Sequence, residues 1–289
     1  MLKTTLDTSW KIGIVGLGLM GGSYARALSE QGYEVGALDL REEAVRFALE
    51  KGWIAHGRSE PDAEWLGQFD LLVFALYPDA FLSWLESYQH LLKPGALLTD
   101  VTGVKGRVIG RVQEMLRPDL EFIGAHPMAG REKSGVEYAT KEIFRGANYL
   151  VVPTEKNTPE AVAICRQLGE TLGFRRVTEL TIGKHDEMIA YLSQLTHCIA
   201  VSLMTCRDTT SMIEYTGDSF RDLTRIGRIN DEMWSELFLM NRDALLEQMD
   251  IFSAAFGQLR DSIARGDREE IRRIMRLSTQ RRGLFDKEE

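Results

Sequence analysis

Cysteine is scarce in this sequence: three residues, Cys165, Cys198 and Cys206, stand among 289. Their odd number and irregular spacing argue against a disulfide framework and against a metal site. We therefore expect buried, reduced thiols, as in a cytoplasmic protein. Cys198 follows His197, but neighbouring residues on a helix point about 100° apart, which disfavours a Cys–His nucleophile.

Positively charged residues are also few: the sequence has 35 lysines and arginines but 43 aspartates and glutamates, which gives a formal net charge of −8. This balance argues against a protein that binds nucleic acid or membrane surfaces in general. No uncharged apolar run reaches the length of a membrane span. A strand and a glycine turn explain the apolar N-terminal stretch better than a signal peptide does. Any anionic ligand must therefore meet a local basic cluster.

One stretch, from Trp10 to Leu40, has the pattern of a βαβ unit. An apolar run leads into three glycines, a helical segment follows, and a second apolar run comes after it. Gly16 permits a tight turn, Gly18 lets the backbone approach a pyrophosphate, and Gly21 lets helix and strand pack closely. The N-terminus of the helix would then face the phosphates. A glycine-rich turn alone could be an ordinary βα turn, but this order of elements favours a dinucleotide site.

Asp39, at the end of the second apolar run, decides which dinucleotide we expect. It lies 18 residues after Gly21, where a carboxylate would accept hydrogen bonds from an adenosine ribose and repel a 2′-phosphate. The cofactor should therefore be NAD rather than NADP. The expected cofactor-binding residues are Gly16, Gly18, Leu19, Met20, Gly21, Asp39 and Arg41.

Strand and helix patterns alternate up to Glu179, which predicts a doubly wound parallel sheet. The expected strands are 12–15, 33–38, 71–76, 96–101, 121–125, 149–152 and 175–177. Only helical patterns follow, with long helices at 181–206 and 241–265 and a last helix capped by Asp267. At 289 residues, two domains are expected. They are an α/β Rossmann-type doubly wound N-terminal domain, residues 1–179, and an all-α C-terminal dimerisation domain, residues 180–289.

Both long helices carry apolar residues at nearly heptad spacing. The stripes are Met188, Leu192, Leu195, Ile199, Leu203 and Cys206 in the first helix, and Leu245, Met249, Phe252, Phe256, Leu259 and Ile263 in the second. Packing within one chain would explain them, but so much apolar helix in a small domain favours a homodimer. Trp234, between the two helices, is expected in the core.

Ligands of doubly wound sheets bind beyond the carboxyl ends of the strands. Three segments arrive there: the glycine turn, residues 100–105 and residues 126–130. His126 directly follows a predicted strand and precedes Pro127, which biases its backbone towards an extended conformation. A lone histidine is usually a packed or solvated side chain, but this position beside the cofactor favours a role in the chemistry.

Two arginines stand out in the acidic chain. Arg221 and Arg225 are four residues apart, so on a helix they share one face and could clamp a carboxylate. Arginines on helices are more often solvated, and solvent exposure explains Arg221 and Arg228 at least as well as ligand binding.

Together these motifs resemble the prephenate and arogenate dehydrogenases, over nearly the whole chain. The matching segments are GLGLMGGS (16–23), DVTGVK (100–105), HPMAGREKSGV (126–136), HD (185–186), SQLTH (193–197) and FRDLTRI (220–226). The resemblance implies an NAD-dependent oxidative decarboxylation in tyrosine biosynthesis. Hydride leaves ring carbon C4 of a cyclohexadienol, prephenate or arogenate, and the ring carboxylate departs as carbon dioxide.

The resemblance also implies roles for individual residues. His126 would bond the C4 hydroxyl, and Arg225 would hold a substrate carboxylate. His197, as a second catalytic residue, and Ser193 would contact the substrate or the nicotinamide. Glu132 matches an acid near the entrance of the site. No metal is implied.

The chain departs from the family pattern at three points. The family often has serine where Gly103 stands, so a hydroxyl near the nicotinamide must come from Thr102 or be absent. Gln194 replaces the first histidine of the family's SHLPH motif, shares a helix face with His197 and could touch the substrate side chain. This leaves the choice between prephenate and arogenate open. The chain also ends without the ACT-type regulatory domain of many relatives, so tyrosine inhibition through such a domain is not expected.

Two other functions stay open. A β-hydroxyacid dehydrogenase or imine reductase would share both halves but needs a catalytic lysine in the middle of the long helix, and Lys184 lies at its start. A non-catalytic NAD sensor would need the glycine turn but not His126, His197 and Arg225.

Overall fold

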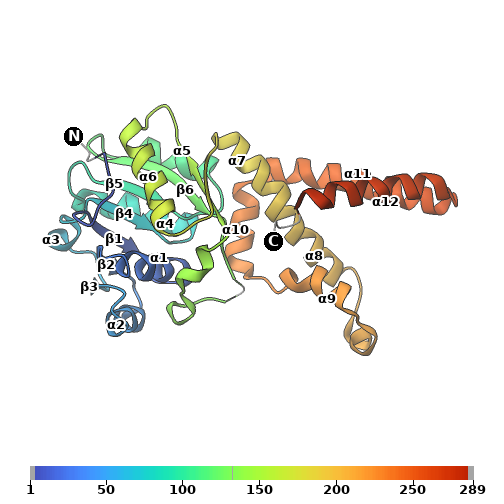
Figure 1. Ribbon diagram of the computed structural model, residues 1–289, viewed down its shortest axis with the longest axis horizontal. Helices are drawn as coiled ribbons and strands as arrows, with labels where there is room; N and C mark the ends of the chain where they lie inside the picture. The colour runs from blue at the N-terminus through green and yellow to red at the C-terminus, as the bar shows by residue number, and fades with distance from the viewer. Residues whose placement is uncertain (1–3, 132, 286–289) are drawn as a thin grey trace. The chain divides into compact units, whose positions relative to one another are not determined.

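The computed structural model describes residues 4–131 and 133–285. The chain divides into two compact units, Met1–Asn241 and Arg242–Glu289, so the predicted domain boundary at residue 180 stays a prediction. The first unit is built on an eight-stranded sheet of order β3-β2-β1-β4-β5-β6-β7-β8 (Figure 1). Its strands are β1 Lys11–Val15, β2 Glu34–Leu38, β3 His56–Arg58, β4 Leu71–Phe74, β5 Leu97–Asp100, β6 Glu121–Pro127, β7 Asn148–Val152 and β8 Arg176–Glu179.

Strands β1 to β6 are parallel, which confirms the Rossmann-type order. β7 runs antiparallel to β6, with Ala125 opposite Val151, and β8 is parallel to β7. The prediction of a doubly wound parallel sheet therefore holds for β1 to β6, whereas β7 and β8 run in the opposite direction. A parallel return needs a long crossover, usually a helix, whereas the chain between β6 and β7 forms only the short 3-10 turns η2 Val136–Tyr138 and η3 Lys141–Phe144.

Helices cover both faces of the sheet, as Figure 1 shows. Helices α1 Leu19–Ser29, α2 Glu42–Glu50 and α6 Pro159–Thr171 pack on one face, and α3 Ala63–Leu66, α4 Pro78–Tyr88 and α5 Gly106–Met115 on the other. Successive strand residues point to opposite faces, so in β4 Leu71 and Val73 join the first core and Leu72 and Phe74 the second. Both faces are buried, which explains why the strands read as unbroken apolar runs.

Two features of this unit escaped prediction. β3, of three residues, and α3, of four, are too short to leave a periodic pattern.

The expectation of buried thiols holds for Cys165, but Cys198 is half-buried and Cys206 is exposed. That expectation was therefore wrong for Cys206.

The long helix predicted at 181–206 is present as α7 Ile182–Ile189, the π-helical turn η4 Ala190–Gln194 and α8 Leu195–Thr205. Thr181 caps it by accepting a hydrogen bond from the backbone amide of Lys184. The π turn holds one more residue than an α turn and so shifts the phase of the helix. The predicted stripe fails at this turn, because Leu192 is 48% exposed while Gln194 and Leu195 are buried.

By length and composition, the helix Ile182–Thr205 is apolar enough to cross a membrane. The prediction that no uncharged apolar run reaches the length of a membrane span was therefore wrong. Only 28% of the apolar stretch of this helix is buried within the chain. Apolar surface of this extent is also what a helix at a subunit interface presents before its partner is in place.

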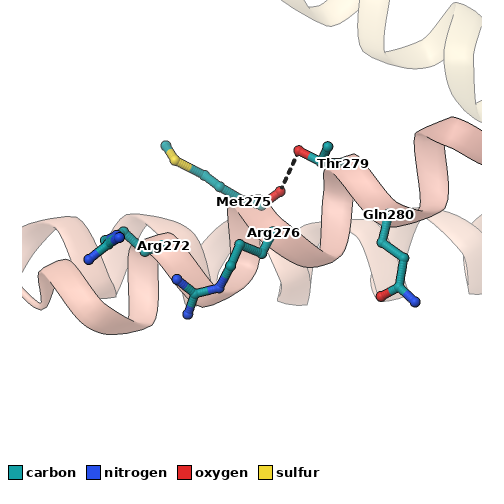
Figure 2. A pocket seen from close by; sticks show the side chains of 5 residues that line it. All are labelled: Arg272, Met275, Arg276, Thr279 and Gln280. Carbon is teal, nitrogen blue, oxygen red and sulfur yellow. Dashed lines mark hydrogen bonds between the residues drawn. The ribbon is translucent and has the colours of Figure 1, made fainter.

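The first unit continues through η5 Thr210–Tyr215, α9 Asp218–Thr224, η6 Arg225–Gly227 and α10 Asp231–Met240. The second unit is a helical hairpin of α11 Arg242–Ala264 and α12 Arg268–Arg282, followed by η7 Gly283–Phe285. Gly266 has φ +67° between the two helices, and Asp267 accepts a hydrogen bond from the amide of Glu270, which confirms the predicted cap. A hollow on α12, shown in Figure 2, is lined by Arg272, Met275, Arg276, Thr279 and Gln280 and contains no predicted site residue.

Candidate active site

The glycine turn between β1 and α1 has the geometry of a dinucleotide cradle. Gly16 has φ +98°, a conformation that other residues rarely adopt, and a side chain there would meet the carbonyl oxygen of Ala75 at 2.6 Å. A side chain at Gly21 would collide with the carbonyl oxygen of Gly16. The space next to Gly18 is open instead: among the described residues, none apart from its chain neighbours would lie within 4 Å of a Cβ at this position. This turn therefore leaves room for a pyrophosphate at the N-terminus of α1.

Asp39 follows β2 and borders the same turn. Its carboxylate accepts hydrogen bonds from the backbone amides of Leu17 at 2.6 Å and of Arg41 at 2.9 Å. The guanidinium of Arg41 bridges Asp39 and the carbonyl oxygen of Leu17. Leu19 and Met20 are half-buried in the first turn of α1. The predicted cofactor residues thus lie around one turn, and their contacts with a cofactor stay predictions.

The loop from β5 to α5 contains a fully buried ion pair. The ammonium group of Lys105 lies 2.6 Å from the carboxylate of Asp100, and it also donates to the carbonyl and hydroxyl oxygens of Thr102 at 2.9 and 3.0 Å. Burial lowers the pKa of Lys105, and Asp100 opposes this shift. The hydroxyl of Thr102 is thus engaged inside the loop, and its predicted contact with substrate stays a prediction.

His126 lies inside β6, opposite Leu150 of β7, rather than after the strand as predicted. Its Nδ1 atom is 3.0 Å from Nε2 of His185, and Nδ1 of His185 is 2.7 Å from the carboxylate of Asp186. A Cβ at Gly103 would lie 3.9 Å from Cε1 of His126, so the far edge of the imidazole faces the β5–α5 loop.

The surroundings of His126 keep its imidazole neutral. Burial lowers the pKa of His126 well below its ordinary value, and the neighbouring His185 and Lys105 lower it further. Burial also lowers the pKa of His185, although Asp186 opposes this shift. A neutral imidazole at the carboxyl end of the sheet can accept a proton near neutral pH.

His185 and Asp186 are site residues for which no individual role was predicted from the sequence. His185 is fully buried on α7, three residues after Ile182 and four before Ile189. A histidine at such a core-facing position is the signal that could have found it, because buried polar groups need partners.

His197 lies on α8 against α10. Its Nδ1 atom donates to the carbonyl oxygen of Ser193 at 2.8 Å, and its ring stacks on Trp234 with 3.7 Å between centroids. Trp234 is half-buried and packs against the hydrophobic core, which agrees with its predicted place there. Leu237, three residues further on α10, lies 3.6 Å from a Cβ built at Gly103. Residues three apart share a helix face, so one face of α10 contacts His197 and borders the loop beside His126.

Gln194 is buried between helices. Its amide group donates to the carbonyl oxygen of Leu237 at 2.9 Å and accepts from Asn241 at 2.7 Å. Asn241 also donates to the carbonyl oxygen of Asp186. Gln194 therefore holds η4 to α10 in this structure, and its predicted contact with the substrate stays a prediction.

The remaining predicted residues lie further along the first unit or cannot be placed. Arg225 is exposed and begins η6, while Arg221 is on α9, so the two do not share one regular helix as predicted. Arg221 donates to Asp218 at 3.2 Å. Glu132 lies outside the described residues. Lys184 is exposed and pairs with Glu187 at the start of α7.

Two family models match this chain. Residues 24–178 match the nucleotide-binding domain of prephenate dehydrogenase, and residues 182–277 match the dimerization domain of prephenate dehydrogenase.

Individual proteins with similar sequences or structures carry related names. A prephenate dehydrogenase of Bacillus subtilis is 27% identical, over 92% of this chain and 73% of its own. The crystal structure of prephenate dehydrogenase from Aquifex aeolicus with hydroxyphenyl propionate and NAD⁺ has a TM-score of 0.88 and 26% identity, covering 96% of this chain and 98% of its own. The Synechocystis arogenate dehydrogenase has a TM-score of 0.82 and 26% identity, covering 96% and 100%.

Proposed function

Because the chain belongs to the prephenate dehydrogenase family, we propose that it oxidises and decarboxylates prephenate to 4-hydroxyphenylpyruvate, with NAD, in tyrosine biosynthesis. One observation carries this proposal: His126, whose pKa is lowered by burial, stands at the carboxyl end of a sheet that also presents a dinucleotide-type glycine turn. The matched models meet between residues 178 and 182, which supports a domain boundary near residue 180. The composition of the chain supports a place in the cytoplasm.

The residues of this chain have separate tasks in the proposed reaction. NAD, when bound, accepts the hydride from ring carbon C4. His126 accepts the proton of the C4 hydroxyl as that oxygen becomes a carbonyl. Arg225 holds a carboxylate of the substrate. The ring carboxylate needs no acid of its own, because aromatisation of the ring drives the loss of carbon dioxide.

The direct test is to incubate the protein with NAD and prephenate, and separately with arogenate, and to follow the absorbance of NADH. We expect turnover with prephenate. Turnover with arogenate but not with prephenate would change the assigned substrate to arogenate, while the assigned reaction, an oxidative decarboxylation, would stay the same. No turnover with either, in a protein that binds NAD, would favour the sensor that the sequence left open. A β-hydroxyacid dehydrogenase is not supported, because Lys184 is exposed and paired with Glu187 at the start of the helix.

We expect Asp39→Ser to narrow the preference for NAD over NADP. Removing the carboxylate removes the repulsion of a 2′-phosphate and the acceptor for the ribose hydroxyls. The measurement is kcat/KM with each cofactor. Glu42→Ser is the matched control, because it removes the same charge from an exposed position at the start of α2. Equal use of both cofactors by the unmodified protein would contradict the assignment of NAD.

We also propose a homodimer formed through the helical half. The model that matches residues 182–277 describes a dimerization domain. In the predicted apolar seam on α11, Leu245 is buried, but Phe252 is 38% and Phe256 is 64% exposed within the chain. A second subunit would cover this surface and the apolar face of Ile182–Thr205.

We expect Phe256→Glu to give monomers or insoluble protein, because a charge would be buried at the seam. Sedimentation of the native chain and the variant measures this. Ala254→Glu is the control, since it places the same charge at an exposed position about 200° around α11. A native chain that sediments as a monomer would rule out the dimer.

A further inference from the structure

A chain of hydrogen bonds runs from the N-terminus of α5 to His126. We propose that Asp186 and His185 form a positioning pair that fixes the tautomer of His126, so that its Nε2 atom carries the lone pair that takes the substrate proton. This inference rests on the proposed function and assigns two further residues to it.

Asp186 sets the direction of the chain, because an ionised carboxylate can only accept hydrogen bonds. The backbone amides of Lys105 and Gly106, at the N-terminus of α5, donate to it at 3.0 and 2.8 Å. Burial alone would raise the pKa of Asp186, but the bonds from His185 and from these amides lower it overall. The helix N-terminus also favours a negative charge at this place. Nδ1 of His185, 2.7 Å away, must therefore carry a hydrogen.

The second bond follows from the first. A neutral His185 with hydrogen on Nδ1 has its lone pair on Nε2. His126 must then donate to that atom from its own Nδ1, 3.0 Å away. The lone pair of a neutral His126 is left on Nε2. Among the residues that the structure describes, no hydrogen bond to this Nε2 atom is found.

The charged groups around His185 keep it neutral, as this direction requires. Lys105 faces it from the β5–α5 loop, with Asp100 bonded to that lysine, and Asp186 adjoins it on α7. Burial lowers the pKa of His185 first and Lys105 lowers it further, against the opposing effect of Asp186. A doubly protonated His185, which could donate to His126 and reverse the bond, is therefore disfavoured.

The pair also acts after proton transfer. When Nε2 of His126 takes the proton, the ring becomes an imidazolium, and its bond from Nδ1 to His185 becomes charge-assisted and stronger. The proton stays on His126, and no bond within His126, His185 or Asp186 breaks. The pair should therefore affect kcat more than the binding of substrate or cofactor.

The first test reads the tautomer without any need for activity. In protein labelled with ¹⁵N-histidine, the nitrogen shifts of a neutral imidazole tell hydrogen on Nδ1 from hydrogen on Nε2. The chain has five histidines, and the signals lost in His126→Asn identify this one. We expect hydrogen on Nδ1 of His126 in the native protein, and a shift of hydrogen towards Nε2 in His185→Leu, which lacks the acceptor.

The second test is kinetic. His185→Leu should lower kcat by roughly 10- to 100-fold, the size found when a partner that orients a metal-bound histidine is removed, with KM and the Kd of NAD little changed. His185→Gln keeps an acceptor near the place of Nε2 and should recover part of the loss. His90→Leu is the matched control, because His90 is exposed on η1 Gln89–Leu91, outside the site.

Native His126 with hydrogen on Nε2 would overturn the proposal, and so would parent-like kcat together with an unchanged tautomer in His185→Leu. If His185→Leu does not fold, the proposal is tested by the tautomer of His126 in the native protein and by the kcat of His185→Gln. If the native protein oxidises neither prephenate nor arogenate but shows hydrogen on Nδ1 of His126, the proposed function fails and the positioning pair stands.

Discussion

His126→Asn is expected to lower kcat by roughly 10²–10⁴-fold, the usual contribution of a general base. The C4 hydroxyl must lose its proton as hydride departs, and asparagine cannot take up that proton. The fold and the Kd of NAD should be preserved, because His126 is not among the predicted cofactor contacts. The measurement is kcat with saturating prephenate, alongside NAD binding by the same variant.

The dependence on pH gives the same residue a second test. Protonated imidazole cannot accept a proton, so activity should fall as pH drops through the pKa of His126. Burial lowers that pKa well below its ordinary value, so this acid limb should lie below about pH 6.5, the value of an unperturbed histidine. The limb should vanish in His126→Asn. If it persists, or if the variant keeps parent-like kcat, the base lies elsewhere and His197 is the first residue to test.

Arg225→Ala is expected to raise KM for prephenate strongly while the Kd of NAD changes little. Loss of one partner from a desolvated, hydrogen-bonded charge pair costs about 2–5 kcal/mol, or about 30-fold to several thousand-fold at 1.4 kcal/mol per factor of ten. Arg225 is exposed within the chain, so the lower end is expected unless bound substrate excludes water from it.

Arg221→Ala is the control for this prediction, because Arg221 is an exposed arginine of the same region that bonds Asp218 and the carbonyl oxygen of Thr216. It should leave KM close to that of the parent. Equal KM values for the parent and Arg225→Ala would assign Arg225 to the structure of η6 instead.

The parts of the fold that could be predicted depend on local patterns. The glycine turn, the spacing to Asp39 and the apolar runs each reflect a constraint within a few residues, such as the φ of +98° at Gly16 or burial on both faces of a strand. The same holds for the cap at Asp267 and the turn at Gly266.

The parts that could not be predicted depend on contacts between distant segments. His126 and His185 are 59 residues apart, and only the packing of α7 beside the sheet brings them to 3.0 Å. The direction of β7 depends on the connection from β6, which contains no crossover helix and brings the chain back antiparallel to β6. In a regular α-helix, Gln194 would lie on the same side as His197. In the structure it lies in the π turn, and its side-chain oxygen accepts a hydrogen bond from the amide of Asn241 instead.

That π turn, Ala190–Gln194, has a consequence for how this helix tolerates change in length. It stands between His185, which bonds His126, and His197, which stacks on Trp234. Because a π turn holds one residue more than an α turn, deletion of one residue there can restore an ordinary α turn and keep His185 and His197 nearly in phase, whereas deletion of one residue from α7 or α8 would rotate one of them relative to the other by about 100°. Substitutions on exposed faces of the helix leave that phase intact. Among relatives, a single-residue gap in this helix should therefore fall in the π turn rather than in α7 or α8.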